Sequence, residues 1–263
     1  MITPDCLAYY KNWFRSFVEK YRHGDEEFVG NIDLKIVHTE RVRLEIISLG
    51  KSLGISDDDL RTAELAALLH DIGRFEQYKK YGTYSDTRSV SHAALGLEIL
   101  ESNSVLIGLD DETRSIITAS VGWHSALFLP EEKSPKEIFF LKMLRDADKI
   151  DILRVVTENY QRPEARNPAI DLDLPDDPSI SDIVYEDLNA ERLVRIENCR
   201  SVNDFKLLQI GWVYDINFPH TYAVIKERNY FVRVFDSLPD DPGISSIRMK
   251  IMKRLELMSS GIN

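Results

Sequence analysis

The chain has 263 residues, of which 43% are hydrophobic and 29% charged, so it is long enough to bury a substantial core. Its 33 lysines and arginines against 44 aspartates and glutamates give a net charge of −11, which argues against nonspecific binding to nucleic acid or to an anionic membrane. With only two cysteines, and no apolar run of the ~18 residues that a membrane span requires, we expect a cytoplasmic protein without a disulfide framework.

Hydrophobic residues recur at helical spacing along most of the chain, which predicts an all-α fold. Ser56 is followed by three aspartates, a strong signal for a helix start, because the hydroxyl caps the first turn and the acids favour its positive end. Gly73 is expected to stop the helix that Ser56 opens. The expected helices that bear on the site cover residues 4–23, 31–49 and 57–72, and begin at Ser89, at Asp110 and at Pro135, the last running to about Thr157.

Three regions are expected along the chain. Residues 1–160 form a helical domain that opens with an amphipathic helix and carries the candidate site. Residues 161–182 are rich in proline and aspartate and are expected to be an acidic loop or linker. Residues 183–263 carry apolar stripes typical of helices packed on the same domain, where they have two open roles, covering the site or forming a homodimer interface.

The run 65–69 is apolar on every side of a helix, which predicts burial all round, and it leads directly into His70 and Asp71. A buried carboxylate costs several kcal/mol unless it is protonated, paired with a cation or bound to a metal. Adjacent helical residues point about 100° apart, so one of the two side chains can bind a metal ion while the other reaches towards a second ion.

Four more candidate ligands, His38, His92, His124 and Asp148, lie on apolar faces of other predicted helices. Two of them have an ordinary alternative: His38 as a core histidine hydrogen-bonded to a carbonyl, and Asp148 as an aspartate neutralised by Arg145 or Lys149 in a helix ion pair. Together with the His-Asp doublet they make six ligands, too many for one tetrahedral ion. They suit two divalent ions, drawn from Mn, Fe, Zn, Ni or Mg, about 3.5–4 Å apart and bridged by Asp71.

In order and helix placement, these residues resemble the HD-domain superfamily of metal-dependent phosphohydrolases over roughly residues 30–157. The motif of that family and the two histidines that its two-metal members add match, in chain order, His38, His70, Asp71, His92, His124 and Asp148. The resemblance implies a helical bundle with additional C-terminal helices, and hydrolysis of phosphate esters or anhydrides, commonly in nucleotides, by a metal-activated water. No Gly-Tyr-Pro follows His124, which departs from the HD-GYP branch and its activity on cyclic dinucleotides.

The cations near the doublet that are expected to bind a small phosphorylated substrate are Arg74, Lys79, Lys80 and Arg88. Arg74 ranks first because HD-GYP relatives carry lysine at this position, and it forms the expected catalytic pair with Asp71. The aromatic-rich segment 75–88 is expected to be a loop, with a surface role and a substrate-facing role both open. The candidates to protonate a leaving group or to accept from ligand histidines are Glu45, Glu76 and Asp151.

Two other functions stay open. A diiron oxygenase of a small polar substrate uses the same ligand types around paired metals, and myo-inositol oxygenase resembles this ligand set. A non-catalytic regulator that binds a metal-nucleotide has no need of open metal positions, which counts against it. Iron-dependent oxygen consumption without phosphate release would favour the oxygenase over the hydrolase.

Overall fold

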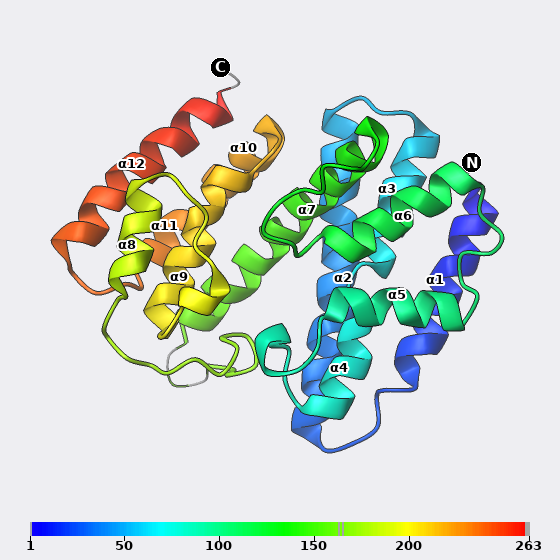
Figure 1. Cartoon of the computed structure of the whole chain (residues 1–263), viewed down its shortest axis with the longest axis horizontal. Coiled ribbons are helices and arrows are strands. Elements are labelled where there is room, and N and C mark those ends of the chain that lie inside the picture. Colours follow the sequence, from blue (N-terminus) through cyan, green and yellow to red (C-terminus); the bar gives the residue numbers. More distant parts are fainter. Residues whose placement is uncertain (1, 163, 165, 261–263) are drawn as a thin grey trace. The chain divides into compact units, whose positions relative to one another are not determined.

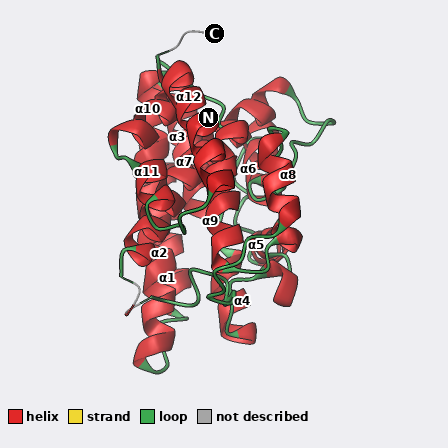
Figure 2. Cartoon of the chain, turned by 90° about the vertical axis from the view of Figure 1, so that its left-hand side faces the viewer, coloured by secondary structure: helices red, strands yellow, loops and turns green. Residues whose placement is uncertain are grey.

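The computed structural model describes residues 2–162, 164 and 166–260 (Figure 1). These residues form helices joined by loops, and no strand occurs among them, which confirms the predicted all-α fold (Figure 2). The chain divides into two compact units, Met1–Asp151 and Ile152–Asn263. Within the described residues, no helix combines the length and the apolar character needed to cross a bilayer.

The first unit contains most of the helices predicted around the site. They are α1 (Pro4–Glu19), α2 (Glu26–Ser52), α3 (Asp57–Leu69), α4 (Gly73–Tyr81), η1 (Asp86–Arg88), α5 (His92–Ser102), α6 (Asp111–Trp123) and the first part of α7 (Pro135–Tyr160). The predicted start signals are used as expected, because Ser56 accepts from the backbone N–H of Asp59 and Asp110 accepts from that of Thr113.

Helix α3 lies at the centre of the first unit and packs against α1, α2 and α6. Its residues 65–69 have no exposed surface, as the all-round apolar pattern predicts. The helix therefore delivers the residues that follow it, His70 and Asp71, into the interior.

Gly73 does not end α3, contrary to the prediction. The helix ends at Leu69, and Gly73 begins α4, so His70 and Asp71 lie in the turn between α3 and α4. The reason for glycine is close packing: a Cβ atom here would overlap the carbonyl oxygen of His92 and lie 2.7 Å from the backbone nitrogen of Gly96. Glycine thus lets α4 approach the backbone of α5.

The segment predicted to be an aromatic-rich loop is partly helical. Its first part lies in α4, which ends at Tyr81 and is followed by Gly82 with a left-handed φ of 64°, the conformation that favours glycine after a helix. Helix α5 then begins at His92, three residues after the predicted start, with Ser91 as its capping residue. A helix cap is a local choice among neighbouring serines, and the sequence offers two of them.

The second unit is also helical. It continues α7 and adds α8 (Asp182–Asn189), η3 (Ile196–Asn198), α9 (Val202–Gly211), η4 (Trp212–Asp215), α10 (Pro219–Glu227), α11 (Tyr230–Phe235) and α12 (Pro242–Ser259). Helix α10 packs on α12, and α9 packs on α8 and α11. No α-helix occurs among the described residues between α7 and α8; residues 163 and 165 of the predicted acidic loop lie outside the described residues.

Candidate metal centre

The structure brings all six predicted ligands together inside the first unit. Ligand atoms within 4.8 Å of one another form three overlapping groups: His38, His70 and Asp71; His70, His124 and Asp148; and Asp71, His92 and His124. They come from α2, from the turn after α3, from the start of α5, from the end of α6 and from α7. Five elements far apart in the chain therefore supply one buried cluster.

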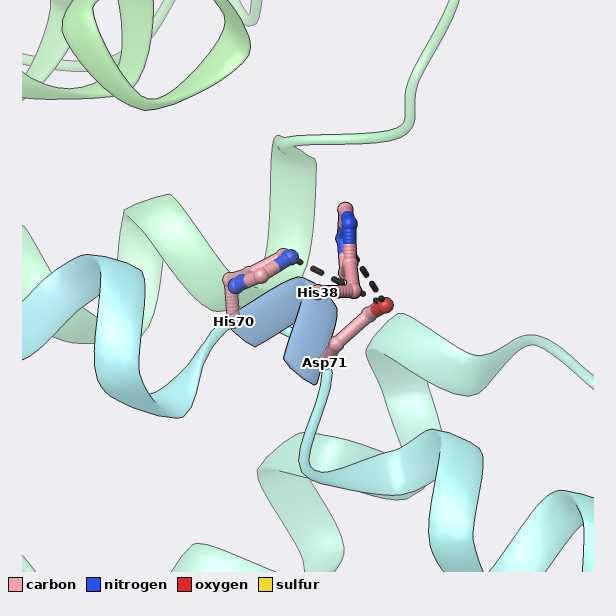
Figure 3. A group of neighbouring side chains, drawn as sticks. All are labelled: His38, His70 and Asp71. Carbon is pink, nitrogen blue, oxygen red and sulfur yellow. Dashed lines mark ion pairs between the residues drawn. The ribbon is translucent and has the colours of Figure 1, made fainter. Parts of the chain in front are cut away.

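One oxygen of Asp71 faces the first group of ligands. Its Oδ2 lies 3.6 Å from Nε2 of His38 and 3.7 Å from Nε2 of His70, two contacts that Figure 3 shows. Asp148 completes this group, because its Oδ1 lies 3.1 Å from Nε2 of His38 and 3.7 Å from that of His70. We call His38, His70, Asp148 and Oδ2 of Asp71 the first half-site.

The other oxygen of Asp71 faces a second pair of imidazoles. Its Oδ1 lies 3.5 Å from Nε2 of His92 and 3.7 Å from Nε2 of His124. The two Nε2 atoms are 3.0 Å apart. We call His92, His124 and Oδ1 of Asp71 the second half-site; the carboxylate of Asp71 thus spans the two half-sites.

Two of the imidazoles are oriented by backbone carbonyls. Nδ1 of His70 donates to the carbonyl of Ala67 at 2.7 Å, and Nδ1 of His124 donates to that of Val121 at 2.9 Å. Both acceptors lie three residues earlier in the chain, at the end of the helix that precedes each histidine. An unpaired carbonyl at a helix end thereby fixes the ring and turns Nε2 towards the cluster.

The other two imidazoles are oriented by carboxylates. Nδ1 of His38 donates to Oδ2 of Asp151 at 2.8 Å, and Nδ1 of His92 donates to Oδ2 of Asp86 at 2.7 Å. Asp151 thus takes one of the two roles considered for it, that of an acceptor for a ligand histidine. A carboxylate behind an imidazole makes the ring a stronger metal ligand, because it stabilises the positive charge that coordination induces.

The chemistry of these atoms fits divalent metal ions. Since every Nδ1 has an acceptor, the inward Nε2 of each neutral ring presents a lone pair, and the carboxylate oxygens beside it are acceptors as well. Nε2 of His70 is buried without a hydrogen-bond partner. A buried group of acceptors needs a cation, and the imidazole and carboxylate set suits a first-row divalent ion.

The pKa values of the histidines separate them into two kinds. Burial lowers the pKa of His70 to about 4 and that of His92 to about 3, so both are neutral at physiological pH. Burial also acts to lower the pKa of His38, but the hydrogen bonds to Asp148 and Asp151 outweigh it and raise this pKa to about 9. In the metal-free protein, a proton on His38 therefore supplies positive charge to the first half-site.

Both ligand aspartates are ionised. Burial acts to raise the pKa of Asp71, but the charges of Lys35 and Arg74 act against it, and this pKa lies well below its usual range. Burial opposes ionisation of Asp148 too, and the hydrogen bond from His38 overcomes it and lowers the pKa of Asp148. The carboxylates are thus held in the charged form that binds metal.

Lys35 is a residue of the site that the sequence analysis missed. Its Nζ donates to Oδ2 of Asp71 at 2.9 Å, and the ammonium lies 5.2 Å from the centre of the Tyr84 ring. Lys35 precedes His38 by three residues in α2, and this spacing places both side chains on one face of the helix. This three-residue spacing is the feature of the sequence that could have identified Lys35 as a residue of the site.

Arg74 lies beside the second half-site. Its Nε is 3.5 Å from Oδ1 of Asp71. Its Nη1 donates to Oε1 of Gln77 and to Oδ1 of Asp86, both at 2.9 Å, and also to the carbonyl of Tyr84. The guanidinium is therefore engaged with acceptors of the protein.

The other predicted cations are Lys79, Lys80 and Arg88, and the contacts of the two lysines are with residues other than the six candidate ligands. Lys79 lies over the ring of Tyr21, in the turn after α1, 5.4 Å from its centre. Lys80 forms an ion pair with Glu76 at 3.2 Å, and Glu76 also accepts from the hydroxyl of Tyr21. Arg88 lies in η1 and is exposed.

A protein-family model described as the HD domain matches residues 36–156 of the chain. No curated protein and no solved structure matches the chain. The matched span includes all six ligands together with both carboxylates that orient them, and it lies almost entirely in the first unit.

Proposed function

We propose that this chain hydrolyses a phosphate ester or anhydride of a nucleotide or other small phosphorylated molecule, because residues 36–156 match the HD-domain model and HD domains are mostly metal-dependent phosphohydrolases. The observation that carries the proposal is the position of Asp71. Its two oxygens face two separate sets of ligands, an arrangement suited to a pair of ions that share one substrate.

Divalent ions held in the two half-sites would lower the pKa of a bound water towards about 7 and would offset the negative charge of a phosphoryl group. The protein's own part is to orient the ligands. Asp71 joins the half-sites, while Ala67, Val121, Asp86 and Asp151 hold the four rings so that Nε2 points inward. Rings fixed in this way are already oriented towards an ion in the half-sites.

We expect the substrate to reach the centre past Lys35 and Asp148. These side chains are 17% and 14% exposed, whereas the four imidazoles are 5% exposed or less. Among the described residues, Asp71 is the only hydrogen-bond partner of the Lys35 ammonium, which has three N–H donors. Lys35 is therefore well suited to bind a phosphate oxygen next to the first half-site.

The four cations predicted from the sequence are proposed to act at different distances from the metal centre. Arg74, beside Asp71, contributes positive charge to the centre, although its contacts with Gln77 and Asp86 leave it less free than Lys35 to bind substrate. The cations proposed for more distant groups of the substrate are Lys79, Lys80 and Arg88.

The test is phosphate release from a panel of nucleotides and sugar phosphates, with protein prepared without chelator and supplied with Mn²⁺, Fe²⁺ or Mg²⁺. We expect release by the wild type and by Asp33→Ala, which removes a surface acid of α2 paired with Arg22. We expect none from Asp71→Ala at an unchanged circular dichroism spectrum. Oxygen consumption with iron and no phosphate release, or nucleotide binding without turnover, would overturn the proposal.

A further inference from the structure

The two half-sites have the same arrangement of imidazoles but differ in the burial of the carboxylate that orients one of them. Each contains one imidazole oriented by a backbone carbonyl and one oriented by a carboxylate. In the first half-site the orienting carboxylate is Asp151, whose side chain is 1% exposed and belongs to the long helix α7. In the second half-site it is Asp86, whose side chain is 34% exposed and belongs to the three-residue turn η1.

The first half-site also has more ligands than the second. The first half-site has two imidazoles, Oδ2 of Asp71 and the further carboxylate of Asp148. The second half-site has two imidazoles and Oδ1 of Asp71. One carboxylate fewer means less negative charge and one coordination bond fewer, so the second half-site depends more on the basicity and orientation of its imidazoles.

Asp86 is held in place by two side chains of α4. Nη1 of Arg74 and Nε2 of Gln77 both donate to Oδ1 of Asp86, at 2.9 and 2.8 Å, which leaves Oδ2 for His92. Gln77 has no exposed surface, and its amide also donates to Oγ of Ser89 and to the carbonyl of Val90 at 2.9 Å. The buried amide thus ties the exposed turn to the helix.

We propose that Asp86, held by Arg74 and Gln77, is the positioning residue that controls occupancy of the second half-site, and that the two ions bind in order, the first half-site filling before the second. The inference rests on the metal centre of the proposed function and not on its reaction. Arg74 then acts on the second ion through Asp86 and His92, in addition to its place beside Asp71.

The experiment titrates metal-free protein with Mn²⁺ by calorimetry and follows the spin-coupled Mn²⁺ pair by electron paramagnetic resonance. We expect two binding events in the wild type. Asp86→Asn keeps the shape of the side chain and removes its charge, so the tighter event should stay unchanged while the weaker one loses about 10–100-fold in affinity. The spin-coupled signal should disappear at Mn²⁺ concentrations that fill the wild type.

Three further variants control the result. Asp151→Asn makes the same change behind His38 and should weaken the tighter event instead. Arg74→Met should weaken the second event in the same direction as Asp86→Asn, which tests the network if one variant folds poorly. Asp33→Asn removes a surface charge and should change neither event.

Two equal binding events in the wild type, a single event, or two wild-type affinities in Asp86→Asn would each overturn the inference. Equal loss of both ions in Asp86→Asn and in Asp151→Asn would also overturn it, because the carboxylates would then support the cluster as a whole. These readouts do not depend on turnover. An inactive protein with the expected pattern refutes hydrolysis alone, and an active protein without it refutes the loading order alone.

Discussion

Asp71 is 3% exposed, yet it carries a full charge between four imidazoles and two cations. Lys35 lies 2.9 Å from its Oδ2, and Arg74 lies 3.5 Å from its Oδ1. Each cation offsets part of the cost of burying the carboxylate while the centre is free of metal. Ions held in the two half-sites would take over that role and would leave Lys35 available to an anionic substrate.

The first prediction concerns Lys35→Met, which removes the ammonium and keeps an unbranched side chain. We expect KM for the phosphorylated substrate, and the Kd for inorganic phosphate on the metal-loaded protein, to rise about 10–100-fold, because one charge-assisted hydrogen bond is lost. Metal affinity should be equal or higher, since no ammonium competes for Oδ2. Calorimetry with phosphate and with Mn²⁺ measures both quantities.

Lys51→Met is the matched control, because Lys51 is exposed near the end of the same helix. It should change neither phosphate binding nor metal binding. If Lys35→Met instead loses metal and keeps its affinity for phosphate, Lys35 serves only to position Asp71.

The second prediction concerns the proton on His38. Because the pKa of His38 is about 9 in the metal-free protein, binding an ion through Nε2 at pH 7.5 should release about one proton. His70 and His92, with pKa values of about 4 and 3, should release none. The release is measured by calorimetry in two buffers that differ in ionisation enthalpy.

The direction of the pKa shift of His38 sets the pH range in which this histidine stabilises the folded protein. A pKa raised from 6.5 to about 9 stabilises the folded metal-free protein fully below pH 6.5, and this stabilisation is lost as the pH rises through 9. Proton release on metal binding should fall over the upper part of that window. Equal release at pH 7.5 and at pH 10 would show that His38 is not its source.

At the scale of elements, the centre depends on how closely α4 approaches α5. Gly73 begins α4 against the backbone of His92, the first residue of α5 and a ligand of the second half-site. The close approach holds the backbone of His92 against the start of α4. The turn between α3 and α4 fixes His70 and Asp71 at the same time.

The third prediction is that Gly73→Ala destabilises the protein by about 1–3 kcal/mol, because backbone atoms must move to admit the methyl group. It should also weaken the second Mn²⁺ event through the displacement of His92. Urea unfolding of metal-free protein measures the stability, and calorimetry measures the binding.

Gly30→Ala provides the contrast within a helix. Gly30 lies in α2, and a Cβ atom there meets no atom within 4 Å, so alanine should stabilise the protein by about 0.5–1 kcal/mol. Equal effects of the two substitutions on unfolding would contradict the close-packing explanation for Gly73.

At the scale of the whole molecule, all six ligands lie in the unit Met1–Asp151, and they come from elements that an unfolded chain would not hold together. An ion therefore binds the folded state in preference to the unfolded state. This preference links metal binding to stability.

The fourth prediction is that Mn²⁺ raises the midpoint of thermal unfolding and that a chelator lowers it. Free metal at 100 times Kd should contribute about 2.7 kcal/mol for one site. Asp71→Asn should lose most of this dependence, because the shared carboxylate serves both half-sites. Differential scanning calorimetry over a series of metal concentrations measures the shift, and identical midpoints with metal and with chelator would argue against a bound ion.

The amino-acid sequence determined the all-α fold, the central position of α3 and the identity of the clustered histidines and aspartates. These features are local: apolar spacing decides which helix face is buried, and capping residues such as Ser56 and Asp110 decide where helices begin. A polar group on a buried face must find a partner, so histidines on separate apolar faces were strong candidates for one common centre.

Only the tertiary structure decided which ligands share a half-site, that Asp86 stands behind His92, and that Lys35 pairs with Asp71. It also decided that Gly73 serves close packing, because the sequence alone does not distinguish a glycine that ends a helix from one at a contact between helices. The physical reason is common to these cases: distances between side chains on different helices depend on how the helices pack, which no local spacing along the chain specifies.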